Sequence, residues 1–173
     1  MPGAAGYSLV ERLRDGSSVE IRALQPDDRE DMLAAIGRTS AHSLQRRFFA
    51  PKRGFSEKEI SFFIDIDFRN HVALVAEVEE NGHPVIAGGG RYIVTEAGVA
   101  ELAFVVVDAY QGKGIGSALL RHVIELARDA GLKELAADVL PDNTAMLSLF
   151  GRLGFRSRTS PDPQVRHLVL ELV

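Results

Sequence analysis

An apolar run that leads through a glycine-rich loop into an amphipathic stretch constrains the fold of this chain more than any other feature. Residues 102–107 read Leu-Ala-Phe-Val-Val-Val, residues 111–117 read Gln-Gly-Lys-Gly-Ile-Gly-Ser, and apolar residues then recur at helical spacing as far as Ala130. This pattern predicts a buried strand, a loop and a helix. A helix N-terminus presents free N–H groups and the positive end of the helix dipole, and glycines let a diphosphate approach them closely. The sequence therefore predicts a phosphate-bearing ligand at this loop.

The spacing of the loop argues against two common phosphate-binding motifs. A Walker P-loop requires glycine at the position of Val107 and a serine or threonine directly after Lys113. A dinucleotide-binding fingerprint requires a third glycine at Ser117 or at Leu119, depending on where it starts. Neither motif fits. Two possibilities remain. The segment is either another type of phosphate-binding glycine loop or a tight strand-to-helix turn that binds no ligand.

Two further patterns stand in order along the chain. The loop contains Gln-x-x-Gly-x-Gly, with Gln111, Gly114 and Gly116 at the fixed positions. About thirty residues later, the segment from Asn143 to Phe155 reads Asn-Thr-Ala-Met-Leu-Ser-Leu-Phe-Gly-Arg-Leu-Gly-Phe. Together these segments resemble the pyrophosphate loop and the later Asn…Leu-Tyr…Gly-Phe segment of the GNAT acyltransferases. The resemblance covers roughly residues 18–173.

The resemblance implies an α/β (α+β) GNAT fold. Its central sheet is mixed but mostly antiparallel, has about seven strands, is flanked by helices, and contains a splayed strand pair that holds CoA. We expect the splayed pair to be the strands at 102–107 and 135–139. We also expect a single domain at 18–173 that follows an N-terminal tail at 1–17. The other strands are expected near 19–24, 72–78, 84–94, 155–158 and 165–173, and helices near 26–37, 40–49, 56–67, 113–130 and after 143.

The resemblance also implies that acetyl-CoA is the acetyl donor and that a primary amine is the acceptor. The diphosphate would lie on the loop, whose candidate residues are Gln111, Gly112, Lys113, Gly114, Ile115, Gly116 and Ser117. The amides of the pantetheine arm would pair with the backbone of Val105, Val106 and Val107 like an added strand. Asn143 would contact the pantetheine, or would simply cap the helix that follows it.

Glu101 is the candidate general base, because it opens the strand that leads into the glycine loop. An alkylammonium group has a pKa near 10.4, so its deprotonation at pH 7 costs about 4.6 kcal/mol. A carboxylate beside the acceptor can take this proton, directly or through water. An ordinary solvent-facing strand glutamate is the alternative interpretation.

One position departs from the family pattern. The chain has Phe150 where the family commonly has a tyrosine that protonates the departing thiolate. Phenylalanine has no proton to give, so we expect Phe150 to pack near the sulfur while the thiolate takes its proton from elsewhere.

Three segments resemble one branch of the family, the bacterial protein lysine acetyltransferases that modify acyl-CoA synthetases. They are the strand that begins at Glu101, Ser40–Phe49 and His71–Ala76. A protein lysine is therefore the expected acceptor, and a small-molecule amine or a non-catalytic CoA-sensing role remains open. A basic cluster consists of Arg46, Arg47, Lys52 and Arg53. It would either attract an acidic surface of a partner protein or simply be solvated.

Composition limits the other possibilities. A net charge of −4, without a basic stripe, disfavours nucleic acid as a partner. No apolar run is long enough to span a membrane. The absence of cysteine excludes disulfides and thiolate metal sites, and it fits a cytoplasmic protein. The histidines at 42, 71 and 122 have no carboxylates at metal-ligand spacing, so we expect surface or packing roles for them and no metal. A homodimer formed through edge strands is a further expectation.

Overall fold

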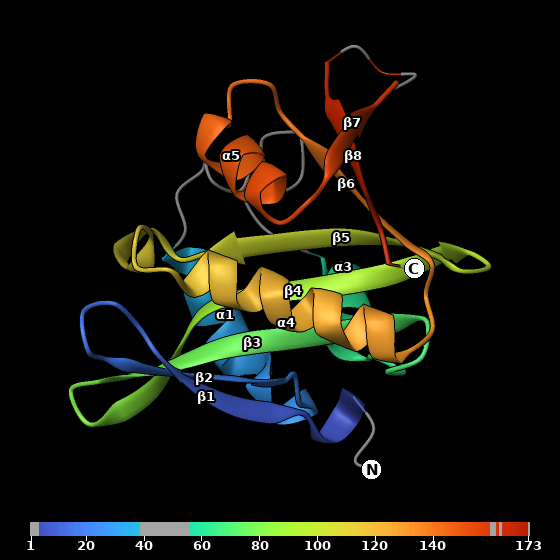
Figure 1. The fold of residues 1–173 in the computed structure, drawn as a ribbon. Coiled ribbons are helices and arrows are strands. Elements are labelled where there is room, and N and C mark those ends of the chain that lie inside the picture. Colours follow the sequence, from blue (N-terminus) through green and yellow to red (C-terminus); the bar gives the residue numbers. More distant parts are fainter. Residues whose placement is uncertain (1–3, 39–55, 160–161, 163, 173) are drawn as a thin grey trace.

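A computed structural model describes residues 4–38, 56–159, 162 and 164–172. Its centre is a mixed sheet of eight strands in the order β1-β2-β3-β4-β5-β6-β8-β7, in which β5 and β6 run parallel and all other neighbours antiparallel (Figure 1). The strands are β1 (Ser8–Arg12), β2 (Ser18–Ala23), β3 (His71–Glu80), β4 (His83–Glu96), β5 (Val99–Val106), β6 (Glu134–Val139), β7 (Arg156–Arg158) and β8 (Arg166–Glu171).

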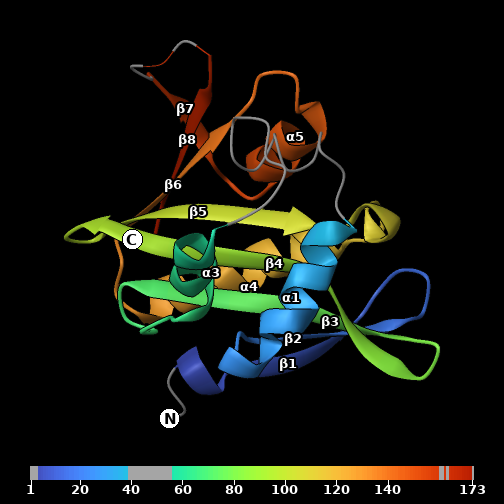
Figure 2. The same ribbon diagram turned by 180° about the vertical axis from the view of Figure 1, so that it is seen from behind.

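Helices cover both faces of the sheet. The long helix α4 (Ile115–Asp129) lies across β3, β4 and β5 on one face, whereas α1 (Arg29–Gly37) and α3 (Glu57–Ile64) lie on the other (Figures 1 and 2). Helix α5 (Thr144–Arg152) lies beside β6, β7 and β8. Short 3₁₀ turns occupy Ala4–Gly6, Pro26–Asp28 and Asp108–Tyr110. The helix expected at 40–49 and the basic cluster lie outside the described residues, and no described helix is long and apolar enough to cross a membrane.

Local sequence signals account for several element boundaries. Asn81 and Gly82 both have positive φ, at 53° and 78°, as the tight turn between β3 and β4 requires. Ser56 caps α3, since its hydroxyl accepts a hydrogen bond from Glu59 N–H at 3.1 Å. The strands expected near 72–78 and 84–94 and the helix expected from residue 56 are thus present, although α3 ends at Ile64 instead of near Asp67.

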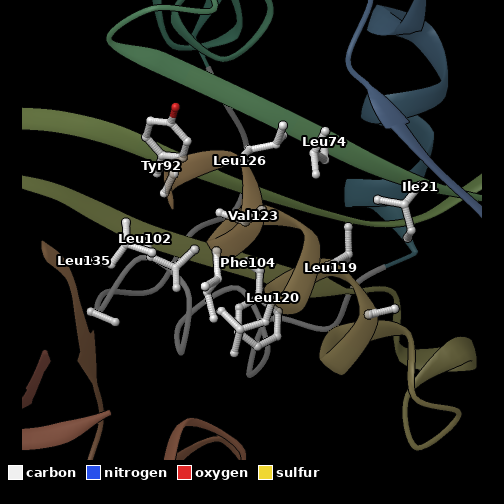
Figure 3. Close-up of a cluster of buried hydrophobic side chains, with 14 of the residues drawn as sticks. Ile21, Leu74, Tyr92, Leu102, Phe104, Leu119, Leu120, Val123, Leu126 and Leu135 are labelled. Carbon is white, nitrogen blue, oxygen red and sulfur yellow. The ribbon is translucent and has the colours of Figure 1, made fainter. Parts of the chain in front are cut away.

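The main core lies between α4 and the sheet. Leu119, Val123 and Ala127 are fully buried on one face of α4, and Figure 3 shows the first two packed among side chains from the strands. Two glycines of β4 make room for this packing. A Cβ at Gly90 would lie 3.4 Å from Val123 Cγ2, and one at Gly88 would lie 3.3 Å from Leu119 Cδ1. Gly88 and Gly90 therefore allow α4 to pack closely on the sheet, whereas Gly89 faces β3. The three glycines also adjoin a register shift between β3 and β4 at Ala76 and Glu77.

The two central parallel strands separate soon after they meet. Pairing between β5 and β6 covers Val99 with Glu134, Ala100 with Leu135, and Glu101 with Ala136. Strand β5 then continues to Val106 while β6, β8 and β7 turn away from it (Figure 1). The expected splay is thus present, and it opens at Glu101.

The N-terminal segment differs from expectation. Residues 8–12, within the segment assigned to a tail, form β1 and pair with β2, which accounts for eight strands instead of about seven. His122, for which a surface or a packing role was expected, is only 8% exposed, because its two ring nitrogens lie against the Tyr7 hydroxyl and, at 2.8 Å, Glu11. Both partners lie more than a hundred residues away in the chain, so helical periodicity alone does not reveal this contact.

Candidate active site

The glycine loop turns sharply into α4. Gly112 and Gly114 have φ of +79° and +93°, and Gly114 is the N-cap of the helix. Residues other than glycine rarely adopt such backbone angles. A Cβ at either position would have no other atom within 4 Å. The space beside these two glycines is therefore open, so that an anion would meet no side chain on its way to the backbone N–H groups at the start of α4. The loop fits the diphosphate of CoA.

A cleft of about 800 Å³ runs from this loop along α5. Ten of the predicted CoA-binding residues line it, namely Val105, Val106, Gln111, Gly112, Lys113, Gly114, Ile115, Gly116, Ser117 and Asn143. Two predicted residues do not. Val107 is buried with residues of α1 and α3 on the other side of the sheet, and Phe150 lines a neighbouring cavity.

Three cationic side chains line the same cleft, namely Arg14, Lys113 and Arg152. Lys113 Nζ lies 3.7 Å from Asp15 Oδ2, in the turn between β1 and β2. Hydrogen bonds from Ser17, and then the charge of Lys113, hold the pKa of Asp15 below its ordinary value. The cations complement the phosphates that the loop is shaped to accept. Sequence reasoning missed Arg14 and Arg152, because an isolated arginine in a turn or at a helix end carries no local signal.

Side chains also fix the backbone around the cleft. Gln111 Nε2 donates to the Val106 carbonyl at 3.0 Å, which ties the loop to the end of β5. Tyr110 donates to Glu80, and this bond, together with burial, raises the tyrosine pKa. Asn143 is 5% exposed, and its Oδ1 accepts from Met146 N–H at 3.4 Å. Asn143 therefore caps α5, as the alternative interpretation predicted, and also lines the cleft.

A second cavity of about 150 Å³ lies where β5 and β6 separate. Phe104 and Met146 line both this cavity and the larger cleft, so the two adjoin. Glu101 lines the second cavity and is exposed. Directly opposed residues of a sheet share a face, and Glu101 pairs with Ile93 on β4 and Ala136 on β6. The candidate base therefore lies at the mouth of the splay.

Phe150 forms part of the wall of this second cavity. Its side chain is 2% exposed, with its ring centroid 4.7 Å from that of Phe155 and 5.9 Å from that of Phe104. The position that carries a tyrosine in the family pattern is thus apolar here and tightly packed.

Three polar residues of the second cavity were missed by sequence reasoning: Arg91, Asp138 and His167. Arg91 Nη1 lies 2.9 Å from His71 Nε2, and His71 is 8% exposed. Of the surface and packing roles expected for His71, the structure shows the packing role. His167 Nδ1 lies 2.7 Å from Asp138 Oδ1. These contacts join residues of different strands, so only the sheet register brings them together.

Fold and site together define a CoA-dependent acyltransferase architecture, and comparison with known proteins agrees. A family model described as "Acetyltransferase (GNAT) family" matches residues 39–155. The chain belongs to this family and is an acetyltransferase.

Three similar proteins cover most of the chain. An acetyltransferase of Pseudomonas aeruginosa is 36% identical over 158 residues, which are 91% of this chain and 85% of that protein. Acetyltransferase Pat of Mycolicibacterium smegmatis is 34% identical over 83% of this chain. The crystal structure of the GNAT domain of S. lividans PAT superposes with a TM-score of 0.87 at 34% identity, and covers 95% of this chain and 96% of that domain. The matched region spans only 43% of the M. smegmatis protein.

We expect Gly114→Ala to lower the affinity for CoA about tenfold. Alanine at a φ of +93° is strained by about 1–2 kcal/mol, so the loop rearranges and its N–H groups turn away from the diphosphate. Isothermal titration calorimetry with CoA measures the change. Gly98→Ala is the matched control, because Gly98 has a φ of +80° in the turn between β4 and β5 but does not line the cleft. Equal affinities for the two variants would contradict the assignment.

Proposed function

We propose that this chain transfers the acetyl group of acetyl-CoA to the side-chain amine of a protein lysine, with Glu101 as the general base. The observation that carries the proposal is the place of Glu101, on the wall of the cavity where β5 and β6 separate and next to the cleft of the glycine loop. The resemblance of three sequence segments to the bacterial protein lysine acetyltransferases supports a protein as the acceptor. The similarity to Acetyltransferase Pat of M. smegmatis and to the GNAT domain of S. lividans PAT is consistent with it.

In this proposal the chain's own residues hold the donor along the cleft. The N–H groups of the loop bind the diphosphate, and Lys113 with its two neighbouring arginines adds positive charge. Beyond Glu101, the backbone of β5 has turned away from β6 and offers its polar groups to the pantetheine amides. The acetyl thioester is then directed toward the second cavity, whose wall contains Phe150.

Glu101 performs the chemistry that the acceptor needs. A lysine ammonium group cannot attack a carbonyl until it loses a proton, and the exposed carboxylate accepts this proton directly or through a water molecule. Because Glu101 is exposed where it lines this cavity, a side chain of another protein can reach the carboxylate.

Labelled acetyl-CoA incubated with the protein and a cell lysate tests the acceptor class. We expect a few discrete acetyl-lysine proteins by mass spectrometry, and expect them to be absent with Glu101→Gln. Label confined to small amines would replace the proposal with metabolite acetylation. No label at all, together with measurable CoA binding, would replace it with a CoA-sensing role.

A further inference from the structure

A histidine held by an aspartate lines the same cavity as the proposed base. His167 lies on β8 and Asp138 on β6, where the two residues pair directly, and His167 Nδ1 is 2.7 Å from Asp138 Oδ1. Glu101 pairs with Ala136, two residues before Asp138, so all three side chains project from one face of the sheet. The His167 side chain is 26% exposed, so it is partly sheltered but accessible from the cavity.

The other wall of this cavity contains no proton donor at the position where the family pattern would place one. Phe150 fills that position with a ring packed against Phe104 and Phe155. A thiolate that leaves an acyl group needs a proton to become a stable thiol, and an imidazolium is a good donor near neutral pH. Because Asp138 occupies Nδ1, the other nitrogen of the ring, Nε2, is the one suited to proton transfer.

We propose that His167 is the general acid of the reaction, and that Asp138 is its positioning residue. This inference rests on the proposed function. In the step, Glu101 first takes a proton from the lysine ammonium and passes it to the solvent. The amine nitrogen then forms the new C–N bond, the thioester C–S bond breaks with its electron pair on sulfur, Glu101 takes the second proton from nitrogen, and His167 Nε2–H gives one to sulfur. The products are an acetamide and a free thiol, and the two groups return to their starting state by exchange of a proton with water.

Charged residues on four neighbouring strands either line the cavity with His167 or pair with it, namely Arg91, Glu101, Asp138 and Arg158. Arg158 on β7 pairs directly with His167, but its guanidinium binds Glu134 at 3.0 Å. Arg91 on β4 contacts His71. Asp138 is thus the charged group in hydrogen-bond contact with the imidazole among the described residues, and it orients the ring as carboxylates do in other acid–base pairs.

NMR of histidine-labelled protein tests whether His167 lies against the sulfur of bound CoA, and it needs no acceptor. The His167 imidazole resonance, assigned by its absence in His167→Gln, should shift when CoA is added and should shift much less with desulfo-CoA, which lacks only the sulfur. The exposed His83 provides the reference resonance. Equal shifts with both ligands, or no shift with CoA bound, would overturn the inference. Calorimetry on the same sample establishes binding, and failure to bind would overturn the inference and the proposed function together.

Kinetics supply the second test. We expect His167→Gln to lower kcat for label transfer into lysate proteins about tenfold and to leave KM for acetyl-CoA unchanged. Imidazole in the buffer should restore activity to His167→Ala. His83→Gln is the matched control and should behave like the parent protein. An unchanged kcat, or a loss that imidazole does not restore, would reject the acid role. Absence of any transfer in the parent protein would reject the proposed function and the acid role with it, whereas failure of the acid role alone would leave the parent protein active.

Discussion

Glutamine in place of Glu101 is expected to lower kcat for acetyl transfer by about two orders of magnitude while the affinity for CoA stays the same. General bases typically contribute factors of about 10² to 10⁴. Glutamine keeps the size of the side chain but cannot take up the proton of the attacking amine. Glu101 lines the second cavity and not the cleft of the glycine loop, so donor binding should not depend on its charge.

The measurement pairs initial rates of transfer into the acceptor proteins with calorimetry for CoA. Glu96→Gln is the matched control, since Glu96 is an exposed glutamate at the end of β4 that lines neither cavity. A loss of activity in both variants would point to net charge instead of the position of one carboxylate. A parent-like kcat for Glu101→Gln would remove Glu101 from the mechanism and leave the cavity without its proposed base.

The features that the sequence predicted well are those encoded within a short stretch of chain. A strand, a glycine loop and a helix adjoin one another between Glu101 and Asp129, so periodicity and spacing are enough to place most of the cleft. The hairpin at Asn81 and Gly82 and the cap at Ser56 are local in the same sense. The splay follows from the resemblance to a family and is confirmed by the three residue pairs that join β5 to β6.

The features that were missed depend on contacts between distant segments. Residues 8–12 form an edge strand because β2 offers a partner, and His122 is buried because Glu11 and Tyr7 reach it from that segment. His167 joins the site through the register of β8 on β6, which its own short segment does not encode. Pairing of strands far apart in the chain, more than residue type, decides which polar groups meet.

We expect Gly88→Ala to lower the free energy of unfolding by about 1–3 kcal/mol, the usual range for overpacking a tight core. A Cβ at this position would lie 2.8 Å from the Val105 carbonyl oxygen and 3.3 Å from Val106 Cα. Both atoms belong to the backbone of β5, so a side-chain rotation cannot relieve the contact. Strands β4 and β5 must separate, and β5 is the strand that lines the cleft.

Urea denaturation compares this variant with Gly151→Ala in the helix α5. A Cβ at Gly151 meets nothing within 4 Å, and alanine in a helix is favoured over glycine by about 0.5–1 kcal/mol, so this control should be more stable than the parent protein. Opposite shifts in the urea midpoint would show that the glycine of β4 is needed for close approach of β5 and not for flexibility. If Gly88→Ala unfolds at the parent midpoint, β5 can move away at little cost. The backbone of β5, which we propose binds pantetheine, would then be held less firmly than its close contact with β4 at Gly88 indicates.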